Sequence, residues 1–253
     1  MDIEIIPCLN DNYSYLIKDN QSKTVAIIDP SEFGPCDKKI NQKYKKLDFI
    51  LNTHHHFDHI GGNAELKNKY GSKVLGFEKD QKRIPEIDVL LKDGQEFEIG
   101  NLNFKTIFIP GHTSGHVAFY FEREKVIFTG DTLFSLGCGR VFEGTYQQMF
   151  NSLNKIKSLP GDTKIYCGHE YTKDNLRFCM KFNPNNSYLK DKKKVIEERI
   201  RKKKPTIPST IKDEIQTNIF LRFDDLDVKD TLNLKKASEL EIFSKLRDLK
   251  DNF

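Results

Sequence analysis

The sequence lacks any long hydrophobic run. Within its 253 residues, no apolar segment approaches the roughly 18 to 20 residues that a helix needs to cross a bilayer. A charged and apolar leader is also missing, because a strand-like segment already occupies residues 1–7. Internal repeats and low-complexity linkers are not evident. These absences predict a cytoplasmic protein with no membrane partner.

A disulfide framework is also lacking. The five cysteines are an odd number and include no Cys-x-x-Cys pair: Cys8, Cys36, Cys138, Cys167 and Cys179. This pattern is typical of free thiols in a reducing compartment, and it argues against a catalytic cysteine.

Net charge is small, at +4, but the positive charge is uneven. Lysines and arginines crowd residues 190–204, which read as a helix after a turn and N-cap at 183–187. Such a run is most often a solvated helix face, and an alternative is a field that attracts an anionic substrate. Nucleic-acid binding is disfavoured because no aromatic residues interleave the lysines.

Metal-ligand side chains are concentrated in residues 53–59, which read Thr-His-His-His-Phe-Asp-His. The segment follows a strand-like run at 47–52 and leads through two glycines to helix-like residues 63–67. In an extended backbone His54 and His56 point to the same side and His55 points away. One zinc site needs only three or four protein ligands, so this density already indicates two metals.

Three more strand-like runs, at 102–109, 125–130 and 163–168, each lead to a further candidate ligand preceded by a glycine. These ligands are His112, Asp131 and His169. Together the seven side chains form a two-metal hydrolytic centre, in which Asp131 bridges two ions with three other ligands each: His54, His56 and His112 for one, and Asp58, His59 and His169 for the other. His55 and His116 are interpreted as supporting or packing groups.

The 53–59 motif resembles the metal signature of the metallo-β-lactamase superfamily, and further segments resemble its glyoxalase II (hydroxyacylglutathione hydrolase) branch. They lie at residues 7–17, 111–116, 130–134, 137–140 and 168–172, with C-terminal matches at 205–211 and 247–253. The resemblance therefore covers essentially the whole chain. It implies that the seven ligands hold two divalent ions, with zinc favoured over iron or manganese, although such ligands suit all three metals.

The resemblance also implies a glutathione site. Arg140 and Phe142 would line the tripeptide, Tyr171 would hydrogen-bond it, and Arg247 and Lys250 would pair with its glycine carboxylate. Phe142 departs from the family pattern, since some members have tyrosine there. Any contact made by that hydroxyl is lost, whereas a backbone contact survives.

The fold expected from the resemblance is an α/β, four-layer α-β-β-α sandwich with a smaller helical C-terminal domain. Strand-like runs give way to charged helical ones near residues 171–173. This change predicts a catalytic domain at 1–172 and a substrate-binding α-helical domain at 173–253. A monomer or weak homodimer is expected.

The expected reaction is hydrolysis of the thioester S-D-lactoylglutathione to glutathione and D-lactate. Two cations that share a water lower its pKa towards about 7, so hydroxide is available to attack the carbonyl at neutral pH. The thiolate, from a thiol of pKa about 8.5, leaves without a strong acid. Asp58 is the group expected to hold the incoming proton.

This chemistry predicts the pH dependence of the rate. We expect kcat/KM to rise through a single ionisation below neutrality and then to stay flat until substrate-binding groups titrate. A pH–rate profile measures this, together with treatment by a thiol reagent. Inactivation by that reagent while the metals stay bound would contradict the prediction.

Two other functions remain open from the sequence. One is a mononuclear-iron glutathione persulfide dioxygenase of the same superfamily, which would need neither a complete second metal site nor the tail with Arg247 and Lys250. The other is a metal-dependent nuclease, favoured only by the basic segment 190–204. The range of acyl groups, the source organism and the role of that basic segment cannot be read from the residues.

Overall fold

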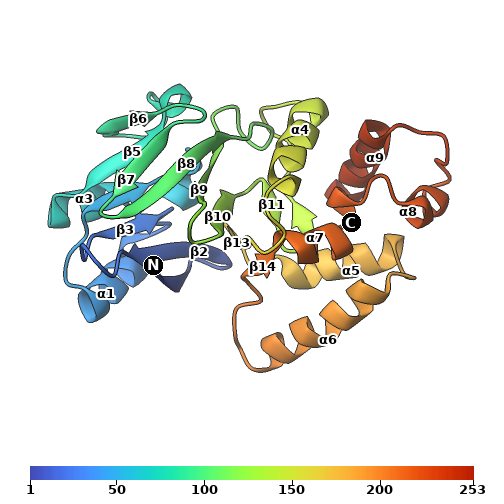
Figure 1. Cartoon of the computed structure of the whole chain (residues 1–253), viewed down its shortest axis with the longest axis horizontal. Coiled ribbons are helices and arrows are strands. Elements are labelled where there is room, and N and C mark those ends of the chain that lie inside the picture. The colour runs from blue at the N-terminus through green and yellow to red at the C-terminus, as the bar shows by residue number, and fades with distance from the viewer. The chain divides into compact units, whose positions relative to one another are not determined.

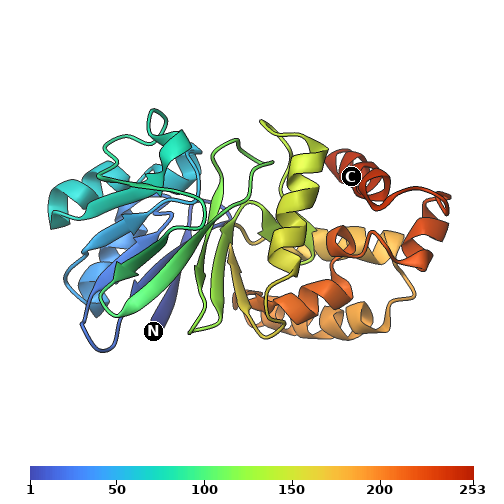
Figure 2. The ribbon, with the colours of Figure 1, turned by 45° about the horizontal axis from the view of Figure 1, so that its top comes forward.

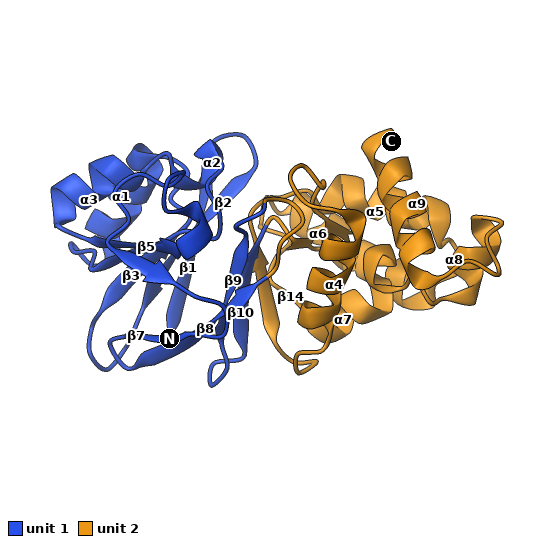
Figure 3. Cartoon of the chain, turned by 90° about the horizontal axis from the view of Figure 1, so that it is seen from above, with its two compact units in different colours: residues 1–108, 114–130 blue, residues 109–113, 131–253 orange.

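The computed structural model describes residues 1–253, which fold into two compact units (Figure 3). Unit 1 comprises Met1–Phe108 and Ser114–Gly130, and unit 2 comprises Ile109–Thr113 and Asp131–Phe253. This division by packing differs from the predicted domains 1–172 and 173–253, which remain a prediction. No helix combines the length and the apolar character that crossing a membrane would require.

Unit 1 contains a six-stranded sheet in which the strands follow their order along the chain. The first three are antiparallel and the last four are parallel, with β3 common to both runs. The strands are β1 (Asp2–Cys8), β2 (Asn12–Lys18), β3 (Val25–Ile28), β4 (Phe49–Leu51), β5 (Lys73–Phe77) and β6 (Val89–Leu91). Four further strands pair antiparallel in the order β10-β9-β8-β7: β7 (Glu96–Ile99), β8 (Leu102–Phe108), β9 (Val117–Phe121) and β10 (Val126–Gly130).

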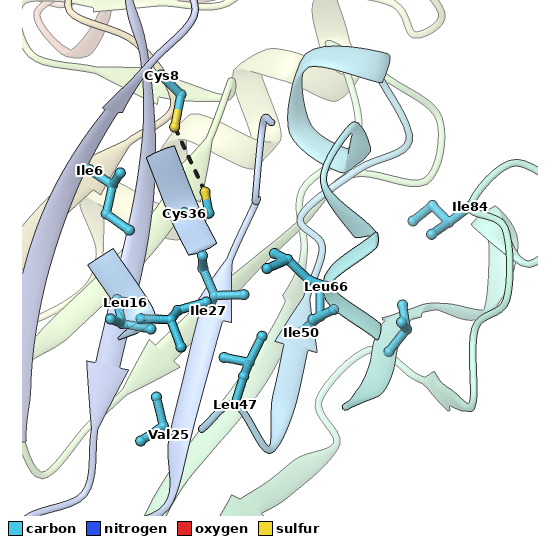
Figure 4. Close-up of a cluster of buried hydrophobic side chains, with 12 residues drawn as sticks. Ile6, Cys8, Leu16, Val25, Ile27, Cys36, Leu47, Ile50, Leu66 and Ile84 are labelled. Atoms are coloured by element: carbon cyan, nitrogen blue, oxygen red, sulfur yellow. Dashed lines mark hydrogen bonds between the residues drawn. The ribbon is translucent and has the colours of Figure 1, made fainter. Parts of the chain in front are cut away.

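Both faces of the six-stranded sheet are covered within unit 1 (Figures 1 and 2). Helices α1 (Phe33–Lys43) and α3 (Asn63–Tyr70) cover one face, over a buried cluster that includes Leu16, Ile27 and Ile50 (Figure 4). The neighbouring residues point the other way, as the strand period of two requires. There Tyr15 meets Phe128 of β10 at 5.2 Å between ring centroids.

Unit 2 consists mainly of helices. Two short antiparallel pairs accompany them, β11 (Leu133–Phe134) with β12 (Gly137–Cys138) and β13 (Lys164–Cys167) with β14 (Ser209–Thr210). The helices are α4 (Tyr146–Lys157), α5 (Thr172–Phe182), α6 (Ser187–Arg201), α7 (Ile211–Thr217), α8 (Leu226–Thr231) and α9 (Glu239–Asp251). Their core is aromatic: Phe178 stacks on Phe220 at 5.7 Å, and Phe243 meets both Phe220 and Phe150.

The predicted elements are confirmed with small shifts at their ends. The strands expected at 47–52, 102–109, 125–130 and 163–168 are β4, β8, β10 and β13. The basic helix is α6, which begins at Ser187 because Asn186 caps it by accepting a hydrogen bond from the Leu189 N–H.

The lysines of α6 are mostly paired with carboxylates. Lys192 binds the fully buried Glu214 of α7 at 2.6 Å, which ties the two helices together. The other pairs on the helix surface are Lys193 with Glu197 and Lys194 with Asp191, and Lys202, the residue after α6, pairs with Glu198. These contacts favour the interpretation of α6 as a structural helix with a solvated face.

Candidate metal centre

The ligand-rich segment starts where a buried parallel strand ends. Asp29 follows β3 and Asn52-Thr53 follow β4, so the parallel pairing of these strands places Asp29 beside Thr53 at one edge of the sheet. The Asp29 carboxylate accepts hydrogen bonds from the Thr53 N–H at 2.8 Å and from the Thr53 hydroxyl at 2.7 Å. The same carboxylate lies 3.0 Å from His59 Nδ1.

These contacts fix which nitrogen of each histidine carries the proton. Thr53 gives its single hydroxyl hydrogen to Asp29, so its oxygen accepts from His54 Nδ1, 3.0 Å away. His59 Nδ1 likewise donates to Asp29, which is only 2 % exposed. Both imidazoles therefore present Nε2, with its lone pair, as the candidate metal-binding nitrogen. The ligand atoms of Asp29, His54 and His59 lie within 4.8 Å of one another.

The remaining histidines of unit 1 pack around this pair. His56 lies edge-on to His54, with 4.7 Å between ring centroids, and the buried His116 stacks on His54 at 4.6 Å. His55 turns to Asp80, whose Oδ2 is 3.7 Å from His55 Nδ1. His54 and His56 thus lie in contact and His55 turns to Asp80, while the roles of these histidines towards a metal stay a prediction.

Asp58 is held by an asparagine from a distant strand. Asn12, at the start of β2, donates through Nδ2 to the Asp58 carboxylate at 2.9 Å and to the Asp58 carbonyl at 3.1 Å. His59 Nε2 is 3.6 Å from the same carboxylate oxygen. Asn12 thus holds both the backbone and the side chain of Asp58, and the carboxylate oxygen that it binds is the one near His59.

In unit 2 two candidate histidine ligands lie near one carboxylate oxygen of a third candidate ligand, Asp131. Asp131 Oδ2 lies 3.1 Å from His169 Nε2 and 3.6 Å from His112 Nε2. Ligand atoms that share a tetrahedral ion at about 2.1 Å are separated by roughly 3.4 Å, so these spacings suit metal ligation. His112 Nδ1 donates to the Arg140 carbonyl at 2.9 Å, which leaves Nε2 for a metal. All three side chains are buried.

Glycines shape two of the three turns that carry these ligands. Gly111, before His112, has a φ of 149°, and Gly130, before Asp131, has a φ of 47°. Only glycine adopts such angles readily. Gly168, before His169, also lies in a bend, but it is not among the residues with positive φ, so this bend does not depend on the left-handed backbone region. A further glycine, Gly139, is required because a Cβ would collide with the Asp131 carbonyl oxygen.

Two predicted substrate residues lie against the metal-ligand candidates of unit 2. The Phe142 ring is 5.2 Å from the His112 ring, and the Tyr171 ring stacks on His169 at 4.6 Å with an interplanar angle of 5°. Phe142 is 62 % exposed and Tyr171 is 38 % exposed. Each of these two aromatic side chains therefore contacts a candidate metal ligand and also has surface that is accessible to solvent.

The three predicted cationic residues differ in their surroundings. Arg247 is 3 % exposed and donates to the Cys138 carbonyl at 2.7 Å and to Asp251 at 2.9 Å. Arg140 is much more exposed and reaches the same Asp251 at 3.5 Å. Lys250 lies over the Phe178 ring, and burial together with neighbouring Arg247 lowers the pKa of its ammonium group. The Arg247 guanidinium is therefore already bound to groups of the protein. Arg140 makes one long ion pair, at 3.5 Å, and Lys250 makes a contact with an aromatic ring.

The residues recognised from the sequence thus fall into two sets. Unit 1 brings together His54, His56, Asp58 and His59, and unit 2 brings together His112, Asp131 and His169 with Phe142 and Tyr171. Sequence reasoning missed Asp29 and Asn12 as partners of the ligands. A usable signal for Asp29 was its place after a buried strand parallel to β4, because the ends of parallel strands share one edge.

Comparison with protein families and solved structures agrees with this fold. Residues 10–169 match the metallo-beta-lactamase superfamily, and residues 170–253 match the hydroxyacylglutathione hydrolase C-terminus. One similar solved structure is BLEG-1 B3 metallo-beta-lactamase, with a TM-score of 0.67 and 23 % sequence identity, covering 87 % of this chain and 99 % of that chain. Another is ETHE1 from Myxococcus xanthus, with a TM-score of 0.71 and 22 % sequence identity, covering 98 % of this chain and 91 % of that chain. The chain has the metallo-β-lactamase fold with a helical C-terminal domain, and its histidine and aspartate clusters bind divalent metal.

Full-length relatives narrow the class. The hydroxyacylglutathione hydrolase of Pelagibacter ubique is 55 % identical over 253 residues, which is all of both chains. That of Methylococcus capsulatus is 44 % identical over 100 % of this chain and 99 % of its own, and that of Brucella ovis is 45 % identical over 100 % and 98 %. The chain belongs to the hydroxyacylglutathione hydrolase family.

Proposed function

We propose that the chain hydrolyses S-D-lactoylglutathione to glutathione and D-lactate, the second step of methylglyoxal detoxification by the glyoxalase pathway. The observation that carries the proposal is the 55 % identity to a hydroxyacylglutathione hydrolase along the whole of both chains. The match of residues 170–253 to the C-terminal region of that family adds support. A cytoplasmic location and a monomer or weak homodimer are part of the proposal.

The proposed cofactor is a pair of divalent ions, most simply zinc, with iron or manganese as alternatives. His54, His56 and His112 would hold one ion, Asp58, His59 and His169 would hold the other, and Asp131 would bridge them. The proton positions on three of the histidines support this set, since each presents Nε2. When bound, such ions acidify a shared water and polarise the thioester carbonyl.

The side chains of the protein would orient these groups and hold a proton. Asp58 is placed to hold the proton of the attacking water, because Asn12 anchors one carboxylate oxygen and the backbone behind it. Asp29 keeps the His59 ring in one orientation, and the Arg140 carbonyl does the same for His112. Fixed orientation lowers the entropic cost of bringing the reacting groups together.

Substrate binding would use the exposed side chains of unit 2. Phe142 and Tyr171 offer apolar surface next to His112 and His169, and the Tyr171 hydroxyl would hydrogen-bond the tripeptide. Arg140 and Lys250 would meet its carboxylates. Arg247 binds the Cys138 carbonyl and Asp251, and through these contacts it would hold the 137–140 segment against α9.

Removal of the Lys250 charge should weaken substrate binding. Because a charge-assisted hydrogen bond to a carboxylate contributes about 1.5 to 3 kcal/mol, Lys250→Ala should raise KM by roughly tenfold to a hundredfold. The effect on kcat should be smaller, since the glycine carboxylate is remote from the scissile bond. Steady-state kinetics on the metal-loaded enzyme measures both constants.

The matched control is Lys245→Ala, which removes an exposed lysine from the same helix. It should leave KM unchanged. Deletion of residues 247–253 is a less specific test than the single substitution Lys250→Ala. The deletion also removes Arg247 and Phe253, and Phe253 packs on Phe178. An unchanged KM in folded Lys250→Ala would rule out the anchoring role.

The proposed activity is tested against the two alternatives in one set of assays. Purified, metal-loaded protein is incubated with S-D-lactoylglutathione, with glutathione persulfide under oxygen, and with a short RNA, and its metal content is determined in parallel. We expect release of glutathione and D-lactate only. Oxygen consumption with the persulfide, or RNA cleavage, without thioester hydrolysis would overturn the proposal.

A further inference from the structure

Two of the five cysteines meet in the buried cluster of unit 1. The sulfur atoms of Cys8 and Cys36 lie 3.8 Å apart (Figure 4). Cys8 is the last residue of β1, and Cys36 lies near the start of α1. Both are free thiols. The sulfurs of Cys167 and Cys179, in contrast, contact backbone carbonyl oxygens.

The direction of the hydrogen bonds around this pair can be worked out. Ser14 donates its single hydroxyl hydrogen to the Asp29 carbonyl at 2.7 Å. Its oxygen, 3.4 Å from the Cys8 sulfur, therefore accepts the S–H of Cys8. With that hydrogen used, Cys36 is the donor between the two thiols, and its S–H points at the Cys8 sulfur.

This arrangement makes the two thiols unequal. The hydrogen bond from Cys36 lowers the pKa of the Cys8 thiol, against the opposing effect of burial. The same contact and burial raise the pKa of Cys36. Both thiols are buried, and Cys8, at 3 % exposed, is the more accessible of the two because Cys36 is 0 % exposed. Cys8 is therefore the thiol that ionises and meets a small reagent first.

We propose that Cys8 and Cys36 form an oxidative modification site for hydrogen peroxide and similar small peroxides. Cys8 is the reacting thiol and Cys36 is the resolving thiol of an internal disulfide. The inference is independent of the proposed thioester hydrolysis. It rests on the placement of the two sulfurs and on the hydrogen bonds that order them.

The chemistry balances with peroxide as the only oxidant. The Cys8 thiolate attacks one peroxide oxygen, the O–O bond breaks, and the departing hydroxide takes up the proton lost by Cys8, so that a sulfenic acid and one water form. Cys36 then attacks the Cys8 sulfur, and the S–O bond breaks as the leaving hydroxide takes the Cys36 proton. The two thiols lose two electrons, and peroxide becomes two waters.

The resolving thiol would protect Cys8 from irreversible damage. A sulfenic acid that meets no thiol is oxidised by a second peroxide to sulfinic acid, which ordinary thiol reductants do not reverse. The two sulfurs would have to close from 3.8 Å to the S–S bond length of about 2.05 Å. The disulfide would tie the end of β1 to α1 in a form that thiol reductants reopen.

The test uses the full-length, metal-loaded protein treated with hydrogen peroxide, quenched with catalase and then denatured. Titratable thiols should fall from five to three, a loss of two, and the intact mass should fall by two hydrogen atoms. Peptide mapping should find Cys8 joined to Cys36, and dithiothreitol should restore both thiols. Retention of all five thiols, or a disulfide that joins other cysteines, would overturn the proposal.

Two single variants separate the roles of the thiols. Cys36→Ser should accumulate a sulfenic acid at Cys8, trapped by a cyclic 1,3-dione, and then a sulfinic acid that dithiothreitol does not reverse. Cys8→Ser should leave Cys36 reduced, and Cys179→Ser, as the matched control, should still form the bridge. Equal oxidation of Cys36 in Cys8→Ser would contradict the assigned order. If a variant fails to fold, the peptide map of the peroxide-treated wild-type protein still shows whether Cys8 and Cys36 form the disulfide.

Discussion

Asp131→Ala should lose bound metal and kcat together while the fold largely survives. Asp131 Oδ2 faces both His112 Nε2 and His169 Nε2, so the substitution removes the group that these two imidazoles share. Loss of a partner that only supports a ligand typically costs about 10- to 100-fold in metal affinity or activity, and loss of the bridging ligand itself should exceed that range. The methyl group that replaces the carboxylate fits a site that is 6 % exposed.

Metal content per chain, measured by elemental analysis after gel filtration, and steady-state kinetics with S-D-lactoylglutathione check this prediction. Circular dichroism and the melting temperature report whether the fold persists. Asp224→Ala, which removes an exposed carboxylate from the same unit, should change neither metal content nor kcat. A folded Asp131→Ala enzyme with normal turnover, or one that keeps two tightly bound metals, would remove Asp131 from the bridging role.

The sequence predicts the local parts of this site well. His54, His56, Asp58 and His59 lie within six residues after one buried strand, so local spacing and strand period suffice to group them. The turns before His112 and Asp131 are also local, since Gly111 and Gly130 supply the positive φ angles. The distant candidates His112, Asp131 and His169 follow from strand-like runs that end in a glycine, and the resemblance to a known family implies the same ligand set.

Contacts between residues far apart in the chain are what the sequence does not reveal. Asn12 reaches Asp58 across 46 positions, and Asp29 reaches Thr53 across 24. The resemblance assigns Arg247 to a substrate carboxylate, and the sequence gives no sign that its guanidinium is buried against the Cys138 carbonyl, 109 positions away. Such pairings depend on strand order and helix packing, which a one-dimensional pattern does not encode. The same holds for the meeting of Cys8 with Cys36.

Asp29→Asn should weaken metal binding although Asp29 is assigned to no ion. Its two oxygens accept three hydrogen bonds: from the Thr53 N–H, from the Thr53 hydroxyl and from His59 Nδ1. An asparagine has one oxygen, so in either orientation its amide donor faces a donor. In a site that is 2 % exposed, an unmet hydrogen bond costs about 1 to 3 kcal/mol. Relief of this conflict by a turned Thr53 hydroxyl or a turned His59 ring would misalign His54 and His59.

We therefore expect metal affinity to fall by roughly 10- to 100-fold, with kcat largely restored at saturating metal. Competition with a chromophoric chelator measures the affinity, and thermal melts measure the loss of stability. Asp48→Asn is the matched control, because the Asp48 carboxylate accepts a hydrogen bond from the Val25 N–H at 2.8 Å but lies before β4, at the opposite end of that strand from Thr53. It should lower the melting temperature and leave metal affinity unchanged. Wild-type metal affinity in folded Asp29→Asn would show that Asp29 shapes the strand ends without orienting the ligands.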